Sequence, residues 1–216
     1  ANGCTATASA TVDEPSALTV SLESENETCA GNDGKINYTI AGGTAGYTVV
    51  LSGDTNQTAN PTAAGTYTFS GLKAGTYTVT VTDGNTCVAT ATATITLNNN
   101  FTVSASDTAI CSGATFTINP TTSHPAKYSW AAPTAIGING AEAGTDASNI
   151  SGTLTNTDTS ATSITYTVAA ATANGLCTAD SFNVVVTVYA PVTGGSIQKD
   201  FIVCNGLDSV VTLTNS

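Results

Sequence analysis

The chain has 216 residues, a formal net charge of −11 and only four basic residues, all of them lysines. This shortage of cations excludes sequence-independent nucleic-acid binding and argues against contact with an anionic membrane surface, because both depend on Lys and Arg. Hydrophobic residues make up 41% of the chain, which argues against disorder. No apolar run is long enough for a spanning helix, and the length suits two domains of ordinary size.

Alternating residues predict β-strands, first at residues 35–40 and then, most clearly, at residues 75–82. In the second strand the threonines would face solvent, and three apolar residues would face a core: Tyr77, Val79 and Val81. The turn Asp83-Gly84-Asn85 offers a residue suited to positive φ, and residues 86–97 alternate again. We therefore predict a β-hairpin here.

Further strands are predicted in the second half of the chain. Residues 115–118 form one strand, and residues 163–168 alternate and pair with residues 181–188 as a second predicted hairpin. Short strands with frequent Gly and Asn turns favour an all-β fold of antiparallel sandwiches.

The chain contains an internal repeat. Residues 2–12 match residues 85–95 at seven of eleven positions, and a looser echo begins at Cys177. In each case a cysteine opens a predicted last strand, whereas the other three cysteines stand in the signature Cys-x-Gly ahead of an early strand. The cysteines therefore alternate between closers (Cys4, Cys87 and Cys177) and openers (Cys29, Cys111 and Cys204).

This alternation gives the domain organisation that we expect. Residues 1–14 would be the last strand of a preceding repeat, and residues 191–216 the start of a following one. Two whole domains would lie between them, at residues 15–98 and 99–190. The chain is thus expected to be a window from a longer array, which also accounts for its lack of methionine.

Two disulfide patterns are open. The first joins opener to closer inside each domain, Cys29 with Cys87 and Cys111 with Cys177, so that Cys4 and Cys204 lack partners within a repeat. The second joins Cys29 to Cys177 across the domain junction, because opener and closer lie at opposite ends of an Ig-type sandwich and a disulfide needs Cα atoms within about 7 Å. Either pattern is structural and implies an oxidising compartment.

Residues 15–97 resemble the SprB-type repeat of giant surface adhesins from gliding Bacteroidetes. The family usually has Pro before Tyr47 and Trp four residues after it, where this chain has Gly46 and Leu51. The matching residues cover nearly the whole domain: Pro15, Cys29, Gly31, Asp33, Gly34, Gly42, Gly43, Tyr47, Gly71, Leu72, Gly75, Thr76, Tyr77, Val79, Val81, Thr82, Asp83 and Cys87.

Residues 101–190 resemble PKD-like, Ig-type repeats of the same adhesins. The resemblance is carried by residues 111–113, 128–130, 152–156 and 166–168, and a third such module begins at residues 194–197 and 204–206. Together the resemblances imply tandem Ig-like and PKD-like antiparallel β-sandwiches, arranged as beads along a filament. They also imply type IX secretion and display on the surface of a Gram-negative bacterium, attached to the outer membrane.

The acidic residues suggest one ligand. Asp13 and Glu14 lie in a predicted linker, and Glu23, Glu25 and Glu27 alternate, so that they would share one strand face. Oxygen ligands of this kind suit Ca²⁺, which extracellular modules bind weakly. One interpretation is a weak calcium site at Asp13, Glu14, Glu23 and Glu25, and the other is a solvated acidic edge that discourages edge-to-edge pairing. No other cofactor is expected.

Two further kinds of site concern modification and catalysis. Thr108 and Ser209 are candidate O-glycosylation sites, since each follows Asp and precedes an apolar residue, which resembles the acceptor motif of this phylum. No catalytic residue is predicted, because the single histidine, His124, lies in a predicted turn without the partners of a hydrolytic triad.

The predicted function is therefore structural and adhesive: a segment of a repetitive surface filament used in attachment and gliding motility, without catalysis. Its expected partners are neighbouring repeats, external surfaces or glycans, and, through other parts of the chain, the motility and secretion machinery. Nucleic acid binding and membrane insertion are not expected. The alternatives are a glycan- or Ca²⁺-binding module and a non-catalytic accessory region of a secreted enzyme.

Overall fold

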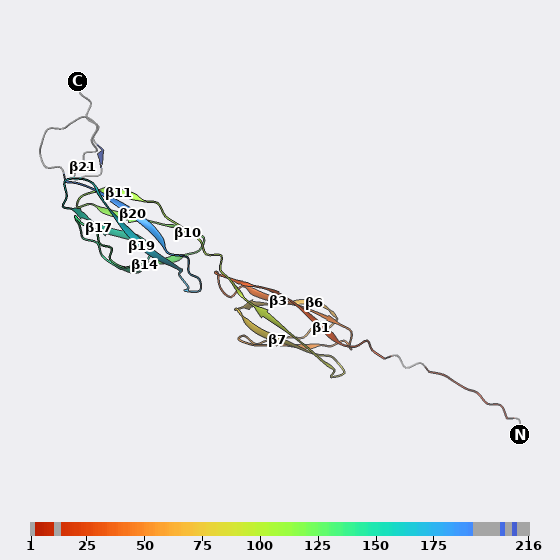
Figure 1. The fold of residues 1–216 in the computed structure, drawn as a ribbon. Helices are drawn as coiled ribbons and strands as arrows, with labels where there is room; N and C mark the ends of the chain where they lie inside the picture. Colours follow the sequence, from red (N-terminus) through yellow and green to blue (C-terminus); the bar gives the residue numbers. More distant parts are fainter. Residues whose placement is uncertain (1–2, 11–13, 192–203, 206–208, 211–216) are drawn as a thin grey trace. The chain divides into compact units, whose positions relative to one another are not determined.

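The computed structural model of the chain describes residues 3–10, 14–191, 204–205 and 209–210, the last two pairs by their backbone only. The described residues form strands, turns and loops, and none of their elements is a helix that could cross a membrane. By its internal contacts the chain divides into two units, residues 1–98 and 99–216 (Figure 1). Each unit is described by itself below.

The first unit consists of two antiparallel sheets that enclose one core. Its strands are β1 (Thr19–Glu25), β2 (Glu27–Thr28), β3 (Gly34–Ala41), β4 (Thr48–Ser52), β5 (Gln57–Ala59), β6 (Gly65–Leu72), β7 (Gly75–Thr82), β8 (Val88–Ile95) and β9 (Leu97–Asn98). One sheet has the order β1-β3-β6 and the other the order β5-β4-β7-β8. In Figure 1, β1, β3 and β6 lie together and β7 lies across from them.

The core of the first unit comes from the inward residues of both sheets. Tyr38 on β3 stacks on Phe69 of β6, with 4.7 Å between the ring centroids, and the facing strands contribute mainly β-branched and aromatic side chains. Such residues suit a pleated, half-buried surface. The buried cluster comprises Ile36, Tyr38, Ile40, Tyr47, Val49, Leu51, Phe69, Leu72, Tyr77, Val79, Val81 and Ile95.

The predicted first hairpin is confirmed. Strand β7 pairs with β8 along its whole length, from Gly75 opposite Ile95 to Thr82 opposite Val88. The three residues predicted to face the core, Tyr77, Val79 and Val81, are all fully buried. The turn differs in one respect, because its residue with positive φ is Thr86, at 66°, one position beyond the predicted Asp83-Gly84-Asn85.

Both units contain one parallel pair that the purely antiparallel prediction did not include. In the first unit, β2 runs parallel to β9, with Glu27 opposite Leu97. In the second unit, β11 (Thr108–Cys111) runs parallel to β20 (Phe182–Tyr189). In each unit a short strand near the beginning of the unit thus pairs with a strand near its end, whose backbone groups would otherwise stay unpaired on that side.

The second unit is built around a five-stranded sheet. Its remaining strands are β10 (Val103–Ser104), β12 (Thr115–Ile118), β13 (Thr121–Thr122), β14 (Ala126–Trp130), β15 (Ile138–Asn139), β16 (Gly144–Ala147), β17 (Ile150–Thr153), β18 (Thr155–Asn156), β19 (Thr162–Thr172), β21 (Cys204–Asn205) and β22 (Ser209–Val210). The sheet has the order β11-β20-β19-β14-β16, and β12 pairs with β17 in a second layer. Figure 1 shows β11, β20, β19 and β14 in this order.

The predicted second hairpin is also confirmed, since β19 pairs with β20 from Thr162 opposite Val188 to Val168 opposite Phe182. Strand β19 extends four residues beyond the predicted end, to Thr172. Of the residues predicted to begin a further repeat, 192–203, 206–208 and 211–216 lie outside the described part of the chain.

Tyr166 fills the centre of the second unit and gives a first prediction. Its ring packs 5.5 Å from Phe116 and 6.3 Å from Trp130, measured between centroids, and its hydroxyl is a buried polar group without a hydrogen-bond partner among the described residues. Because a buried unsatisfied hydroxyl is unfavourable, Tyr166→Phe should leave the melting temperature unchanged or raise it. Thermal unfolding followed by the fluorescence of Trp130 measures this, and a marked fall would show that the hydroxyl has a stabilising partner.

Candidate functional site

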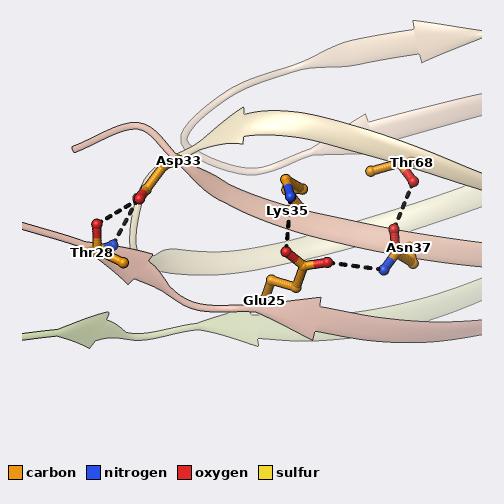
Figure 2. A network of polar contacts seen from close by, with 6 residues as sticks. All are labelled: Glu25, Thr28, Asp33, Lys35, Asn37 and Thr68. Carbon is orange, nitrogen blue, oxygen red and sulfur yellow. Dashed lines mark hydrogen bonds and ion pairs between the residues drawn. The ribbon is translucent and has the colours of Figure 1, made fainter. Parts of the chain in front are cut away.

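A polar network of the first unit crosses the sheet formed by β1, β3 and β6 (Figure 2). Glu25 at the end of β1 stands directly opposite Lys35 on β3, and its carboxylate lies 3.0 Å from the Lys35 ammonium. Asn37 donates a longer hydrogen bond, of 3.5 Å, to the same carboxylate and accepts one of 2.6 Å from the Thr68 hydroxyl on β6. The network therefore joins all three strands.

A second polar group closes the loop between β2 and β3. Asp33 accepts hydrogen bonds from the backbone N–H and the hydroxyl of Thr28, at 2.7 and 2.6 Å, as Figure 2 shows. Glu27, only 3% exposed, accepts the backbone N–H groups of Asn32 and Ala74, both at 2.7 Å. These carboxylates hold turns together, so their oxygens are already engaged.

The four residues predicted to bind calcium do not form a cluster among the contacts that the structure describes. Glu23 and Glu14 are exposed, Glu25 is paired with Lys35, and Asp13 lies outside the described residues. Among described residues no three His, Cys, Asp or Glu side chains gather into a group that could hold a metal ion. The calcium site stays a prediction that no contact of the described residues supports.

The expectation that three glutamates share one strand face is wrong. Strand β1 ends at Glu25, and the chain then turns into β2, so that Glu27 is buried while Glu23 and Glu25 are exposed. The Asn26 side chain accepts the Thr96 N–H at 3.0 Å and holds this change of direction. The sequence pattern could not reveal the break, because two-residue alternation continues through it.

A third carboxylate organises the turn between β7 and β8. Asp83 is buried and accepts the backbone N–H groups of Thr44, Asn85 and Cys87, at 2.8, 2.9 and 2.8 Å. The Asp83 side chain therefore ties this turn to the loop between β3 and β4. It also fixes the place of Cys87, which is exposed and has a free thiol.

Acid should destabilise the first unit. The pKa of Glu25 is lowered by its hydrogen bond to Lys35 and then by the charge of that lysine, that of Asp33 by the Thr28 hydroxyl, and that of Asp83 chiefly by the Thr44 N–H. A carboxyl with a lowered folded pKa contributes stability that is complete above its unfolded pKa, near 4, and is lost as pH falls through the folded value.

We therefore expect the urea midpoint of the first unit to fall steadily between about pH 5 and pH 2. Hydrogen exchange in residues 75–82 follows this unit alone. Asp33→Asn should flatten the pH dependence, because the substituted side chain does not titrate. An equal slope for wild type and variant would contradict this role of Asp33.

The bonding state of the cysteines contradicts the first disulfide pattern. Cys29, Cys111 and Cys177 are disulfide-bonded, whereas Cys4 and Cys87 are free and exposed. The predicted Cys29–Cys87 pair is therefore wrong. Cys29 lies beside the Asn98 carbonyl, beyond the end of β8, whereas Cys87 immediately precedes its first residue. An eight-residue strand spans about 25 Å, far more than a disulfide bridges.

The predicted Cys111–Cys177 pair fails for the same reason. Cys111 pairs with Tyr189 at the end of β20, whereas Cys177 lies in the loop before β20 begins and its carbonyl accepts the Thr172 N–H. The whole of β20 separates the two residues. The second pattern, Cys29 with Cys177, stays a prediction.

Peptide mapping without reduction tests this second pattern. Cleavage after the four lysines at 35, 73, 127 and 199 places Cys29 in residues 1–35 and Cys177 in residues 128–199. We expect a linked mass for these two peptides, which reduction splits. Finding residues 1–35 linked instead to residues 74–127 or 200–216 would contradict the pattern.

Of the two candidate glycosylation sites, the structure describes the surroundings of Thr108 only. Thr108 is half-buried in β11, and the preceding Asp107 accepts the Val185 N–H at 2.8 Å. The side chain of Ser209 lies outside the described part of the structure. Thr108 also borders an open polar depression of about 340 Å³, lined by Ser104, Ala105, Ser106, Asp107, Thr117, Ile118, Asn119 and Thr121. Glycosylation at both positions stays a prediction.

One buried amide in the second unit was not singled out by the sequence. Asn156 at the end of β18 is 1% exposed. Its amide nitrogen donates to the Ser160 and Val188 carbonyls, both at 2.8 Å, and its amide oxygen accepts the Asp158 N–H at 2.8 Å. Asn156 thus ties β18 to the end of β20. Only its place in residues 152–156, part of the PKD-like resemblance, could have signalled this role.

The single histidine of the chain has the surroundings of a loop residue. His124 Nδ1 lies 3.0 Å from the hydroxyl of the neighbouring Ser123, which itself lies 3.3 Å from the Asn100 carbonyl and accepts the Thr102 N–H at 2.9 Å. No acidic side chain contacts His124 among the hydrogen bonds of the described residues. A base without an orienting acid does not form a hydrolytic triad.

Comparison with known proteins identifies part of the chain. Residues 107–191 match the family described as PKD-like domain, whereas a search of curated proteins gave no match. Similar solved structures include titin domains I67–I69 in an E-to-A mutated variant (TM-score 0.36, 11% identity, covering 80% of this chain and 66% of that one). A structure concerning host cell surface retention of a bacterial ice-binding adhesin has a TM-score of 0.30 at 13% identity, covering 80% and 65%.

The C-terminal fragment of intimin in complex with its receptor domain is a further similar structure, with a TM-score of 0.29, 15% identity and coverage of 82% and 64%. The chain thus spans about two thirds of the length of these three structures. Identities and TM-scores this low support no inference about function. The chain is an all-β protein with an Ig/PKD-like fold, and residues 107–191 carry its match to the PKD-like domain.

Proposed function

We propose that the chain is a structural and adhesive segment of a long, repetitive cell-surface filament, and that it catalyses no reaction. The observation that carries this proposal is the PKD-like match of residues 107–191, in a chain whose other unit is also built of two β-sheets around one core. Successive domains of this kind give a protein reach, since each folds around its own core.

The disulfide-bonded cysteines support an extracellular place for this segment. Cys29, Cys111 and Cys177 are oxidised, and disulfides persist outside the reducing cytosol. They restrict the unfolded chain and so protect a domain against force and proteolysis. The shortage of charged residues, 9% of the chain, leaves a surface of small hydroxyl groups. Such a surface is suited to water or neutral glycans as neighbours.

The more specific part of the proposal rests on the resemblance of residues 15–97 to SprB-type repeats. On this basis the filament serves surface attachment and gliding motility, leaves the cell by type IX secretion and is attached to the outer membrane of a Gram-negative bacterium. Its partners would be neighbouring repeats, external surfaces, and the motility and secretion machinery through other parts of the chain.

Antibody fragments raised against this chain test the proposal on intact cells of the source bacterium. We expect them to label cells without permeabilisation and to reduce attachment to a surface, because the segment would lie on an exposed filament. An antibody fragment against an unrelated surface protein is the control. Labelling that requires permeabilised cells would contradict the proposed location.

A glycan-binding function is the second candidate, and the depression beside Thr108 is the observation that favours it. Its lining offers hydroxyl, amide and carboxylate groups in one place, which are the groups that recognise sugar hydroxyls. Binding of the whole chain on a glycan array, abolished by Asn119→Ala, would support this function. No binding to any glycan would leave the segment as a spacer.

A further inference from the structure

Two Asn-Gly dipeptides lie wholly within the part of the chain whose side chains the structure describes, Asn139-Gly140 and Asn174-Gly175. An Asn-Gly pair is chemically labile, because the main-chain nitrogen of the glycine can attack the side-chain carbonyl carbon of the asparagine. Glycine has no side chain that would hinder this approach. All four residues are exposed, so exposure alone does not distinguish the two dipeptides.

Hydrogen bonds hold Asn174-Gly175 in its turn. The Gly175 N–H donates to the Thr172 carbonyl at 2.8 Å. The side-chain oxygen of Asn174 accepts the Thr172 hydroxyl at 2.6 Å and the Leu176 N–H at 3.0 Å. The nitrogen that would attack is therefore engaged, and the carbonyl that it would attack is held in place. Both restraints oppose the reaction at this dipeptide.

Asn139-Gly140 lacks these restraints. Among the hydrogen bonds between described residues, none involves the Asn139 side chain or the N–H and carbonyl of Gly140. Asn139 is the last residue of β15, a strand of two residues that pairs with β18 alone. The other end of β15 is held by Thr157, whose N–H and hydroxyl both donate to the Gly137 carbonyl. The end that carries Asn139 therefore opens more readily.

The fold itself requires glycine at position 140. Gly140 has a φ of 90°, a conformation that residues with a side chain rarely adopt, and a Cβ atom there would contact the Thr153 carbonyl oxygen. The path of the chain thus places an unhindered nitrogen directly after Asn139. The nearest other asparagine, Asn149, is followed by Ile150, whose branched side chain hinders the same attack.

We propose that Asn139 is a site of spontaneous deamidation. The Gly140 nitrogen loses its proton and bonds to the side-chain carbonyl carbon of Asn139, while the carbon–nitrogen bond of the side-chain amide breaks and ammonia leaves with that proton. The product is a five-membered cyclic imide. One water molecule opens the imide at either carbonyl and yields aspartate or isoaspartate at position 139. The reaction uses no oxidant and does not depend on the function proposed above.

The product alters the pairing of β15 with β18. Either form adds a negative charge at an exposed position, and isoaspartate also lengthens the main chain by one carbon atom. Asn139 stands opposite Thr155, which is followed by Asn156, the buried amide that ties β18 to the end of β20. An additional main-chain atom at position 139 therefore shifts the backbone groups that pair with Thr155.

Ageing of the full chain tests the proposal, with Asn174 as the matched control in the same molecule. The chain is kept at physiological temperature in mildly alkaline buffer, then unfolded, reduced and cut with chymotrypsin, and a zero-time sample is digested in parallel. Cleavage after aromatic residues and leucines places Asn139 in residues 131–154 and Asn174 in residues 167–176. Exchange of an amide NH2 for OH raises the peptide mass, which mass spectrometry resolves.

We expect residues 131–154 to gain this mass at least about tenfold faster than residues 167–176, a ratio that one hydrogen bond can set. Fragmentation should place the change at Asn139. Asn139→Gln should abolish the gain, because glutamine would have to form a less favourable six-membered ring. Equal rates for the two peptides, no conversion at Asn139, or an unchanged gain in the Asn139→Gln chain would overturn the proposal.

Unfolding the chain before ageing gives a second control. In concentrated guanidinium chloride both dipeptides lose their folded contacts, so we expect residues 131–154 and 167–176 to gain mass at similar rates. If Asn139 keeps its full advantage over Asn174 in the unfolded chain, the hydrogen bonds around Gly175 do not cause the difference, and the structural basis of the proposal is wrong.

Discussion

Replacing Glu27 by alanine should lower the free energy of unfolding of the first unit by about 2–4 kcal/mol. The side chain is buried, and its two oxygens accept the Asn32 and Ala74 N–H groups at 2.7 Å. Removing the carboxylate takes away the protein acceptor of both N–H groups and leaves an empty space where the buried Glu27 side chain lay. For a domain of this size the melting temperature should fall by about 10–25 °C.

Glu25→Ala is the matched control for this prediction. Glu25 lies two residues away, is the same residue type, and is more than half exposed in its ion pair with Lys35, and exposed pairs of this kind contribute little. Calorimetry should show a large shift for Glu27→Ala, a smaller one for Glu27→Gln and almost none for Glu25→Ala. Equal shifts for Glu27→Ala and Glu25→Ala would contradict the structural role of Glu27.

Asn156→Ala should destabilise the second unit by a similar amount, about 2–4 kcal/mol. The substitution removes two donors and one acceptor from a buried side chain, and so breaks its hydrogen bonds with the Ser160 and Val188 carbonyls and the Asp158 N–H. Because Trp130, the one tryptophan of the chain, is buried in this unit, its fluorescence reports the transition directly.

Asn183→Ala is the control in the same unit. The side chain of Asn183 is exposed on β20 and accepts a hydrogen bond of 2.9 Å from the Thr167 hydroxyl. Its loss should change stability by about 0.5 kcal/mol or less. If Asn156→Ala unfolds at the same temperature as Asn183→Ala, the buried amide does not hold β18 to β20.

The sequence predicted the strands well where two-residue alternation reflects burial. Tyr77, Val79 and Val81 face the core as expected, and both predicted hairpins form in register. Alternation works here because each strand has one buried and one exposed face.

The burial of polar residues could not be predicted from two-residue alternation. Glu27 continues the pattern of Glu23 and Glu25 in sequence, yet it alone is buried, because the chain changes sheet at Asn26. For the cysteines the sequence left two patterns open, and the second already assumed that opener and closer lie at opposite ends of a sandwich. The structure decides between the two patterns for the first unit, because Cys29 and Cys87 lie a full strand length apart.

The two units are stabilised in a similar way. Each unit has its own core, and buried polar groups tie the strand ends together, as Glu27 and Asp83 do in the first unit and Asn156 in the second. On the function proposed above, the segment would work as a pair of β-sandwiches reinforced by the disulfides at Cys29, Cys111 and Cys177.

Pulling single molecules by their two ends tests whether disulfides reinforce the two sandwiches. We expect discrete unfolding steps under oxidising conditions and a longer total extension after reduction, because the bonds at Cys29, Cys111 and Cys177 would otherwise keep part of the chain from extending. Smooth extension without discrete steps, or the same total length with and without reductant, would contradict this expectation.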